Sequence, residues 1–241
     1  MNRKNLTGAW WKSMARGLLV TALGIWAGMP PAGAAESATA VTCEGRAASG
    51  TVSRIDIEDS AVILVATPQF QDPRWQKTVL LAAPLPNGGH VGVIINRPTE
   101  LTLGTLFPEH EASQKVRDPV FFGGPFFVNV LVAVARSDAP VAPGHLRLGG
   151  GLVLAMGESA VDGIIEHDAD KARYFVGLVA WRPGELDIEL ANKLWSVCQA
   201  DAETVFRADV KRLWNELSAA TRRTRVSLPL PADALAQWLI R

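Results

Sequence analysis

Cysteine and histidine are scarce in this chain of 241 residues, which has two cysteines and four histidines. No histidine lies at metal-ligand spacing to a cysteine or to another histidine, so the sequence gives little support for a zinc site. The glycine run Gly149–Gly151 lacks the lysine and hydroxyl of a phosphate-binding loop, and no serine lies in a nucleophile elbow. The sequence therefore predicts no metal, no cofactor and no catalytic group. The histidines are His90, His110, His145 and His167.

A long apolar run and an excess of basic charge are also missing. Beyond the N-terminal region no uninterrupted apolar run reaches a membrane-spanning length, which excludes a polytopic membrane protein. The whole chain has 24 basic and 24 acidic residues. Four of the basic residues and no acidic residue lie in residues 1–34, so the remainder carries 20 basic and 24 acidic residues, a net charge of −4. A mildly acidic protein is a poor partner for nucleic acid.

The first 34 residues have the pattern of a secretory signal peptide. A basic segment precedes the short apolar run Leu18–Met29, and Ala32–Ala34 supplies the small residues of a cleavage site. The alternative is an uncleaved membrane anchor, but the apolar run is short for a membrane span. We therefore expect a periplasmic or secreted protein, which meets the membrane only through its signal peptide.

The two cysteines, Cys43 and Cys198, are far apart in the sequence. In an oxidising compartment they can form a disulfide, or they can remain two separate thiols. Cys43 belongs to residues 35–60, a small and polar segment that reads as a flexible arm. A disulfide would connect this arm to the C-terminal half of the chain.

Residues 62–125 are the stretch around which the chain is organised. Apolar runs at 62–67, 78–83, 91–96 and 120–122 predict buried strands, and Pro86–Gly89 predicts a hairpin turn between the second and third. Residues 101–107 have the spacing of a short helix, and residues 108–118 read as an exposed charged loop.

Strands and helices alternate in the second half of the chain. Further strands are predicted at 129–135, within 146–155, at 173–181 and at 195–198. Helices are predicted at 158–167, from Pro183 onward, at 202–206 and at 210–217. This order indicates an α/β fold in a single compact domain at residues 61–220, followed by a C-terminal tail at 221–241.

Several of these segments resemble the AlgH/YqgE family of bacterial proteins. They read ATPQFQDPRWQKTVLL, GVIINRPTELTLGTL, VFFGGP, RYFVGLVAWRPGELDIELANKLW and ADAETVF, and they occur in the family's order over residues 62–217. The resemblance implies a mixed, largely antiparallel sheet flanked by helices. The family has no established biochemical activity, although some members carry a transcriptional-regulator label. This chain differs from typical members in its exported N-terminus and its additional C-terminal tail.

The family motifs supply a group of candidate ligand-binding residues. Asn96 and Arg97 match the Asn-Arg-Pro motif, and an arginine at a strand end can bind a carboxylate or phosphate through its fork of donors. Gly123 and Gly124 match the Gly-Gly-Pro motif, where glycine permits close approach of a ligand to the backbone. The remaining candidates are Asp72 and Arg74 in the Asp-Pro loop, and Trp181 and Glu185, where Glu185 replaces the family's usual glutamine.

Each candidate also has a purely structural interpretation. Asn96 can cap a turn, Arg97 can pair with Asp72 or Glu185, and the glycines can serve backbone conformation alone.

Three functions are compatible with these features. The first is a non-catalytic module of the cell envelope that binds a small anionic ligand or an envelope protein. The second is an enzyme acting on a small anionic substrate at the same residues. The third is a regulator that binds nucleic acid, which export disfavours. The sequence gives no oligomeric state.

Overall fold

The computed structural model describes residues 60–137 and 142–226. The predicted signal peptide, nearly all of the predicted arm and the last part of the tail lie outside these residues. The strands are β1 (Val62–Ala66), β2 (Val79–Pro84), β3 (His90–Ile94), β4 (Pro98–Thr102), β5 (Pro119–Phe122), β6 (Phe126–Arg136), β7 (His145–Gly149), β8 (Leu152–Met156), β9 (Ala172–Trp181) and β10 (Trp195–Gln199). The helices are α1 (Leu103–Leu106), α2 (Glu158–His167), α3 (Glu185–Ala191), α4 (Ala202–Val205) and α5 (Leu213–Val226), with single 3₁₀ turns η2 (Ser113–Lys115) and η3 (Ala169–Lys171).

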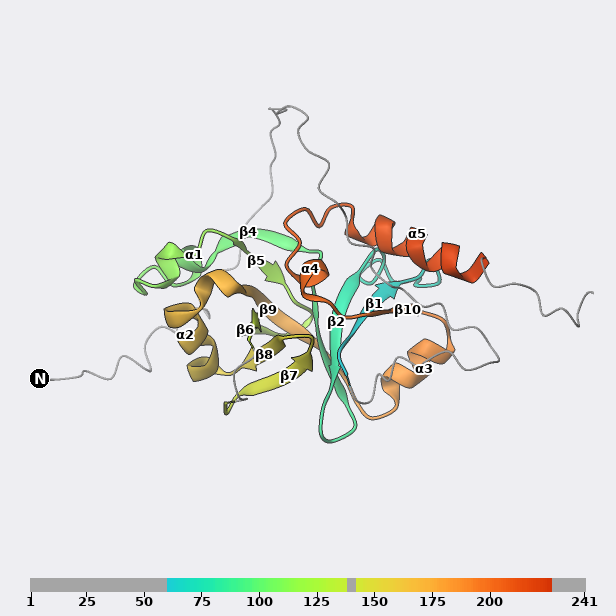
Figure 1. The fold of residues 1–241 in the computed structure, drawn as a ribbon, viewed down its shortest axis with the longest axis horizontal. Helices are drawn as coiled ribbons and strands as arrows, with labels where there is room; N and C mark the ends of the chain where they lie inside the picture. Colours follow the sequence, from blue (N-terminus) through green and yellow to red (C-terminus); the bar gives the residue numbers. More distant parts are fainter. Residues whose placement is uncertain (1–59, 138–141, 227–241) are drawn as a thin grey trace, which may run out of the picture.

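The described strands form one sheet in the order β10-β1-β2-β3-β9-β6-β8-β7. Consecutive strands of this order pair antiparallel, and β5 adds a parallel contact to β9 while β4 pairs with β5. Strand β9 is therefore central, because β3, β5 and β6 all pair with it. The prediction of a single α/β domain with a mixed, largely antiparallel sheet is confirmed (Figure 1).

Both faces of the sheet are covered at β1, β2, β3 and β8, which explains why these strands are buried at almost every position. Along β1, Ile63 and Val65 belong to a core that α4 and α5 complete, whereas Val62 and Leu64 belong to a core under α3. Along β6, Val132 and Val134 belong to the core that α4 and α5 complete, whereas Leu131 and Ala133 belong to a third core beneath α1 and α2. The helices α2 and α3 thus cover separate parts of the sheet, on opposite sides of Figure 1.

Three predicted segments differ from the observed ones. Residues 98–102 form β4, so the prediction of a helix across 101–107 is wrong for its first part, and α1 is only one turn long. At the C-terminal end, α5 continues to Val226, past the tail boundary that the sequence suggested after residue 220. Within the segment predicted to be an exposed loop, Ser113 is fully buried in η2.

None of the helices in residues 60–137 and 142–226 is long and apolar enough to cross a membrane.

Candidate functional site

A pocket of about 400 Å³ lies between α3 and the end of β9. We call it the tryptophan pocket, because three of its walls are indole rings from segments far apart in the chain. Strand β9 forms the floor, α3 one side, and the loop between β1 and β2 another. The lining residues are Trp75, Phe126, Val179, Ala180, Trp181, Glu185, Ile188, Glu189 and Trp195.

The turn between β9 and α3 places the helix over this pocket. Gly184 adopts a left-handed conformation (φ = 80°) immediately before α3, which glycine reaches without a steric cost. A carboxylate oxygen of Glu185 accepts a hydrogen bond from the Arg182 backbone N–H (2.8 Å), and this fixes the first turn. Leu186 packs inward and is almost fully buried. Glu185 and Glu189 therefore lie one turn apart on the same side of α3, where both line the pocket.

Glu189 holds two of the three indoles in place. Its Oε2 accepts hydrogen bonds from Trp181 Nε1 (3.0 Å) and from Trp195 Nε1 (2.6 Å). Both indoles use the same oxygen, so Oε1 accepts no hydrogen bond from the described residues. The carboxylate therefore orients the pocket walls and keeps acceptor capacity for a further donor.

The aromatic walls meet edge to face. The rings of Trp75 and Trp195 cross at 81° with centroids 6.2 Å apart, and Phe70 supports Trp195 from outside the pocket at 4.7 Å. Trp181 and Trp195 are buried, whereas Trp75 is only partly buried. The pocket therefore combines rigid indole walls with two carboxylates, and its lining contains no basic residue. Arg182 lies close outside it, with Nε 4.0 Å from Glu185 Oε1 and a side chain that is 88% exposed.

Exposed apolar side chains border the pocket. Phe126 and Ile188 line it and are 48% and 63% exposed, and the next two residues of β6, Phe127 and Val128, are 62% and 52% exposed. The pairing of β6 with β9 shifts register between Phe126 and Leu131, and Phe127 has a positive φ of 52°. Such strain in a residue with a side chain costs about 1–3 kcal/mol and is concentrated at functional sites.

Asn96 and Arg97 make hydrogen bonds within the protein. Asn96 Oδ1 accepts from the Val79 backbone N–H (2.9 Å), and Nδ2 donates to the Lys77 carbonyl (2.8 Å). Arg97 Nη2 donates to the Arg74 carbonyl and to Thr78 Oγ1, both at 2.6 Å. Burial lowers the pKa of Arg97. Both side chains thus anchor the loop that carries Trp75, so they act on the tryptophan pocket through its wall.

The two candidate glycines lie where β3, β5 and β9 meet. The Gly123 carbonyl accepts from the Ile94 N–H and its own N–H donates to the Val176 carbonyl, both at 2.8 Å. A Cβ at Gly123 or Gly124 would overlap the backbone of Gly177 or Leu178. The close neighbour of these glycines is therefore strand β9.

The Asp72 carboxylate pairs with the Arg74 guanidinium rather than with Arg97. The Arg74 guanidinium lies 2.7 Å from the Asp72 carboxylate, and this hydrogen-bonded contact lowers the pKa of Asp72. Both belong to the loop that carries Trp75. Cys198 lies in β10 and is fully buried. Cys43 lies outside the described residues, so the pairing of the two cysteines stays a prediction.

Of the eight candidate ligand-binding residues, Trp181 and Glu185 line the tryptophan pocket. Sequence reasoning missed Trp75, Glu189 and Trp195. One signal was available, because Glu185 and Glu189 share a helical face beside an aromatic strand end. No pattern in the sequence shows that Trp75, more than 100 residues away, closes the same pocket.

The described residues define a single-domain α/β protein whose largely antiparallel sheet curls into a half-barrel flanked by few helices. The AlgH-like family profile matches residues 63–224, and the chain belongs to that family, as the sequence motifs predicted. A UPF0301 protein of Streptomyces coelicolor is 30% identical over 175 residues, which cover 70% of this chain and 89% of the relative. A UPF0301 protein of Xylella fastidiosa is 29% identical over 157 residues, covering 63% and 83%.

The solved structures that resemble this fold agree with the family assignment. The solution structure of the AlgH protein from Pseudomonas aeruginosa has a TM-score of 0.55 at 22% identity, covering 80% of this chain and 98% of that one. A crystal structure of a Corynebacterium diphtheriae protein gives the same TM-score and identity, covering 72% and 88%. At this identity the likeness concerns the fold.

Proposed function

We propose that this protein is a non-catalytic binding module of the cell envelope, and that its tryptophan pocket receives a lysine or arginine side chain of a partner protein. One observation carries this proposal: three indole rings and two carboxylates surround one pocket that no basic residue lines. A cation over an indole face is attracted by the ring quadrupole, and a carboxylate beside it adds a charge-assisted hydrogen bond.

The surroundings of the pocket favour a protein segment as the source of the cation. Phe126 and Ile188 expose apolar surface at its border, and Phe127 and Val128, which follow Phe126 in β6, are also exposed. Exposed aromatic residues around a polar anchor are typical of protein-binding surfaces. The pocket favours a cation, because its lining has two carboxylates and no basic residue. The sequence predicted an anionic ligand at Asn96 and Arg97, but both of these side chains make hydrogen bonds within the protein.

Binding of a lysine peptide tests the pocket. The probe is a fluorescent pentapeptide with lysine at its centre and valine on either side, compared with matched peptides that have norleucine or glutamate at the centre. We expect saturable binding, measured by anisotropy, in the order lysine, norleucine, glutamate. A desolvated cation–π contact contributes about 2 kcal/mol. Trp75→Ala is therefore expected to weaken lysine-peptide binding about 10- to 30-fold.

Charge variants separate electrostatics from shape. Glu189→Gln keeps an oxygen that can accept from both indoles but removes the charge, so it is expected to weaken the lysine peptide and leave the norleucine peptide unchanged. Glu100→Gln changes an exposed carboxylate on β4 and serves as the matched control. Equal binding of the lysine and glutamate peptides, or wild-type binding by Trp75→Ala, would contradict the proposal. Turnover of a small anionic substrate, abolished by Arg97→Ala, would favour the enzyme alternative.

The envelope location rests on the leader-like residues 1–34 and has its own test. Mass spectrometry of the protein from the periplasmic fraction is expected to give a chain beginning at Ala35, because cleavage follows the small residues Ala32–Ala34. A pairing of Cys43 with Cys198 would lower this mass by about 2 Da relative to the reduced chain, because a disulfide forms with loss of two hydrogens. Recovery of a chain that retains Met1 only in the cytoplasm would contradict export and reopen the nucleic-acid alternative.

A further inference from the structure

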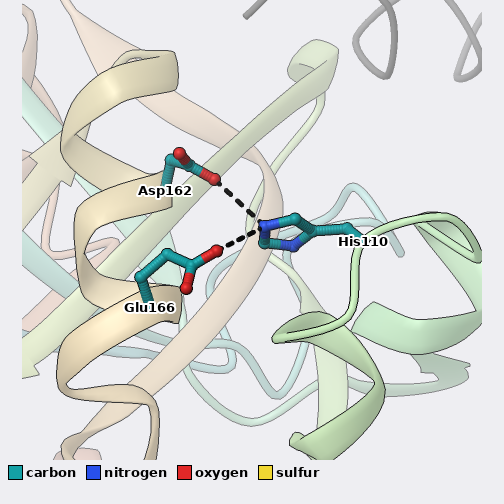
Figure 2. Close-up of side chains that lie close together, drawn as sticks. All are labelled: His110, Asp162 and Glu166. Atoms are coloured by element: carbon teal, nitrogen blue, oxygen red, sulfur yellow. Dashed lines mark hydrogen bonds and ion pairs between the residues drawn. The ribbon is translucent and has the colours of Figure 1, made fainter. Parts of the chain in front are cut away.

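A second group of side chains, far from the tryptophan pocket, has the composition of a metal site. His110 lies between α1 and η2, and Asp162 and Glu166 lie one turn apart on α2 (Figure 2). We call these three residues the His110 cluster. His110 Nε2 is 3.0 Å from Glu166 Oε1 and 3.5 Å from Asp162 Oδ1. Helix α2 carries two residues of the cluster and α3 lines the pocket, and these two helices lie on opposite sides of the molecule in Figure 1.

The His110 imidazole offers too few hydrogen-bond donors for the two carboxylates of the cluster. An imidazole nitrogen carries at most one proton, and Nε2 already lies within hydrogen-bond distance of Glu166. Asp162 Oδ1 is inaccessible to solvent and has no hydrogen-bond partner among the described residues. A buried acceptor without a donor costs about 1–3 kcal/mol, and more when it is charged. One proton therefore cannot satisfy the two carboxylates that converge on this nitrogen.

The second ring nitrogen of His110 has the environment of a metal ligand. Nδ1 lies 2.7 Å from Ser113 Oγ, and Ser113 is fully buried. Ligating histidines generally donate their other N–H to an oxygen, which fixes the ring and directs the free nitrogen at the metal. The Phe107 carbonyl also accepts from the His110 backbone N–H (3.1 Å). The imidazole is thus held so that Nε2 faces α2.

The spacing of the donor atoms fits a small divalent ion. Zinc binds histidine nitrogen and carboxylate oxygen at about 2.0–2.2 Å, so tetrahedral ligands are separated by roughly 3.3 Å. The separations of His110 Nε2 from Glu166 Oε1 and Asp162 Oδ1, 3.0 and 3.5 Å, lie on either side of this value, and all three donor atoms lie within 4.8 Å of one another. One imidazole with two carboxylates suits zinc better than calcium or magnesium, which prefer oxygen ligands alone.

We propose that His110, Asp162 and Glu166 bind one Zn²⁺ ion, through Nε2 and one oxygen of each carboxylate. The ion supplies the positive charge that the two converging carboxylates lack. It ties the segment between α1 and η2 to α2, so that metal-bound protein is harder to unfold. Histidine spacing did not predict this site, because two of the three ligands are carboxylates more than 50 residues from His110.

Zinc titration of chelator-treated, tag-free protein tests the proposal. We expect calorimetry to give one Zn²⁺ per chain and the melting temperature to rise with added zinc. His110→Ala and Asp162→Asn are each expected to weaken binding about 100-fold or more, because each removes a ligand, and Ser113→Ala about 10-fold, because it removes only the supporting hydrogen bond. His167→Ala is the matched control, since that imidazole bonds the Gly163 carbonyl on the same helix (2.9 Å) and lies outside the cluster.

The variants also separate loss of binding from loss of folding. Asp162→Asn keeps the shape of the side chain, so its circular dichroism spectrum and its melting temperature without metal are expected to match the wild type. Co²⁺ in place of Zn²⁺ reports coordination directly, because tetrahedral cobalt absorbs strongly in the visible range. No saturable zinc binding by the wild type at about 100 μM, or equal binding by wild type, His110→Ala and Asp162→Asn, would overturn the proposal.

Discussion

Gly177→Ala is expected to lower the free energy of unfolding by about 3–5 kcal/mol. Gly177 lies in the middle of β9, the strand that pairs with β3, β5 and β6, and its φ is +74°. A side chain in this left-handed region costs about 1–2 kcal/mol. The added Cβ would also overlap the Gly124 carbonyl oxygen, and backbone on both sides prevents relaxation. The loss is a large part of the 5–15 kcal/mol that stabilises a typical domain.

Urea unfolding, followed by circular dichroism, measures this effect. Gly163→Ala is the matched control, because Gly163 is an exposed residue within α2 and a Cβ there would meet nothing within 4 Å. Alanine at that position is expected to raise the free energy of unfolding by about 0.5–1 kcal/mol. An unfolding midpoint for Gly177→Ala equal to that of the wild type would show that Gly124, between β5 and β6, is not packed as closely against β9 as described.

Arg173→Met is the second substitution with a large expected effect, a loss of about 3 kcal/mol. Arg173 is a buried residue of β9, and its guanidinium donates to the carbonyls of Val205 (2.6 Å) and Arg207 (2.9 Å). It also lies 4.4 Å above the ring of Phe121. These contacts hold the end of α4 against the sheet. Methionine keeps much of the volume but leaves two carbonyls without their donor.

Arg136 provides a comparison with the same chemistry at the surface. It donates to the Ala202 carbonyl at 3.4 Å and lies over the Phe206 ring, but it is exposed at the end of β6. Arg136→Met is therefore expected to cost less than about 0.5 kcal/mol. Equal melting temperatures for the two methionine variants would contradict a central role for Arg173.

The effect of Arg173→Met is expected to be independent of pH below about 9. Burial lowers the pKa of Arg173 to about 10. The group is thus charged in both the folded and the unfolded state near neutral pH, and the two states bind the same number of protons there. Above pH 10 the unfolded state binds more protons at this position, so its contribution to stability rises with pH. Urea midpoints at pH 6 and 8 check the absence of a difference.

Local patterns in the sequence predicted most of the framework. The continuous apolar runs that became β1, β2 and β3, and the Asn-Gly turn before β3, depend on neighbouring residues alone. The segment at 98–107 was misread because Leu101, Leu103 and Leu106 suit either a strand followed by a turn of helix or one short helix. The pairing of β4 with β5 decides between them, and that pairing joins residues about 20 positions apart.

The glycine motif also shows what a local sequence pattern leaves undecided. Gly123 and Gly124 stood out in the sequence as positions where another group can approach the backbone closely. The close neighbours that the structure shows are Gly177 and Leu178 of β9, and ligand binding at these glycines stays a prediction. Sequence identifies a position where a Cβ has no room, but only the tertiary structure identifies what fills the space.

The sequence by itself determined the family, the order of strands and helices and the burial of both sheet faces, because each is recorded in consecutive residues. Only the tertiary structure decided the two sites. Trp75, Trp181 and Trp195 come from three segments that meet at the edge of α3, and His110 meets Asp162 and Glu166 across a gap of more than 50 residues. Which side chains come together depends on how β9 pairs with three strands and on which helix covers each part of the sheet. Neither property is present in any local window of the chain.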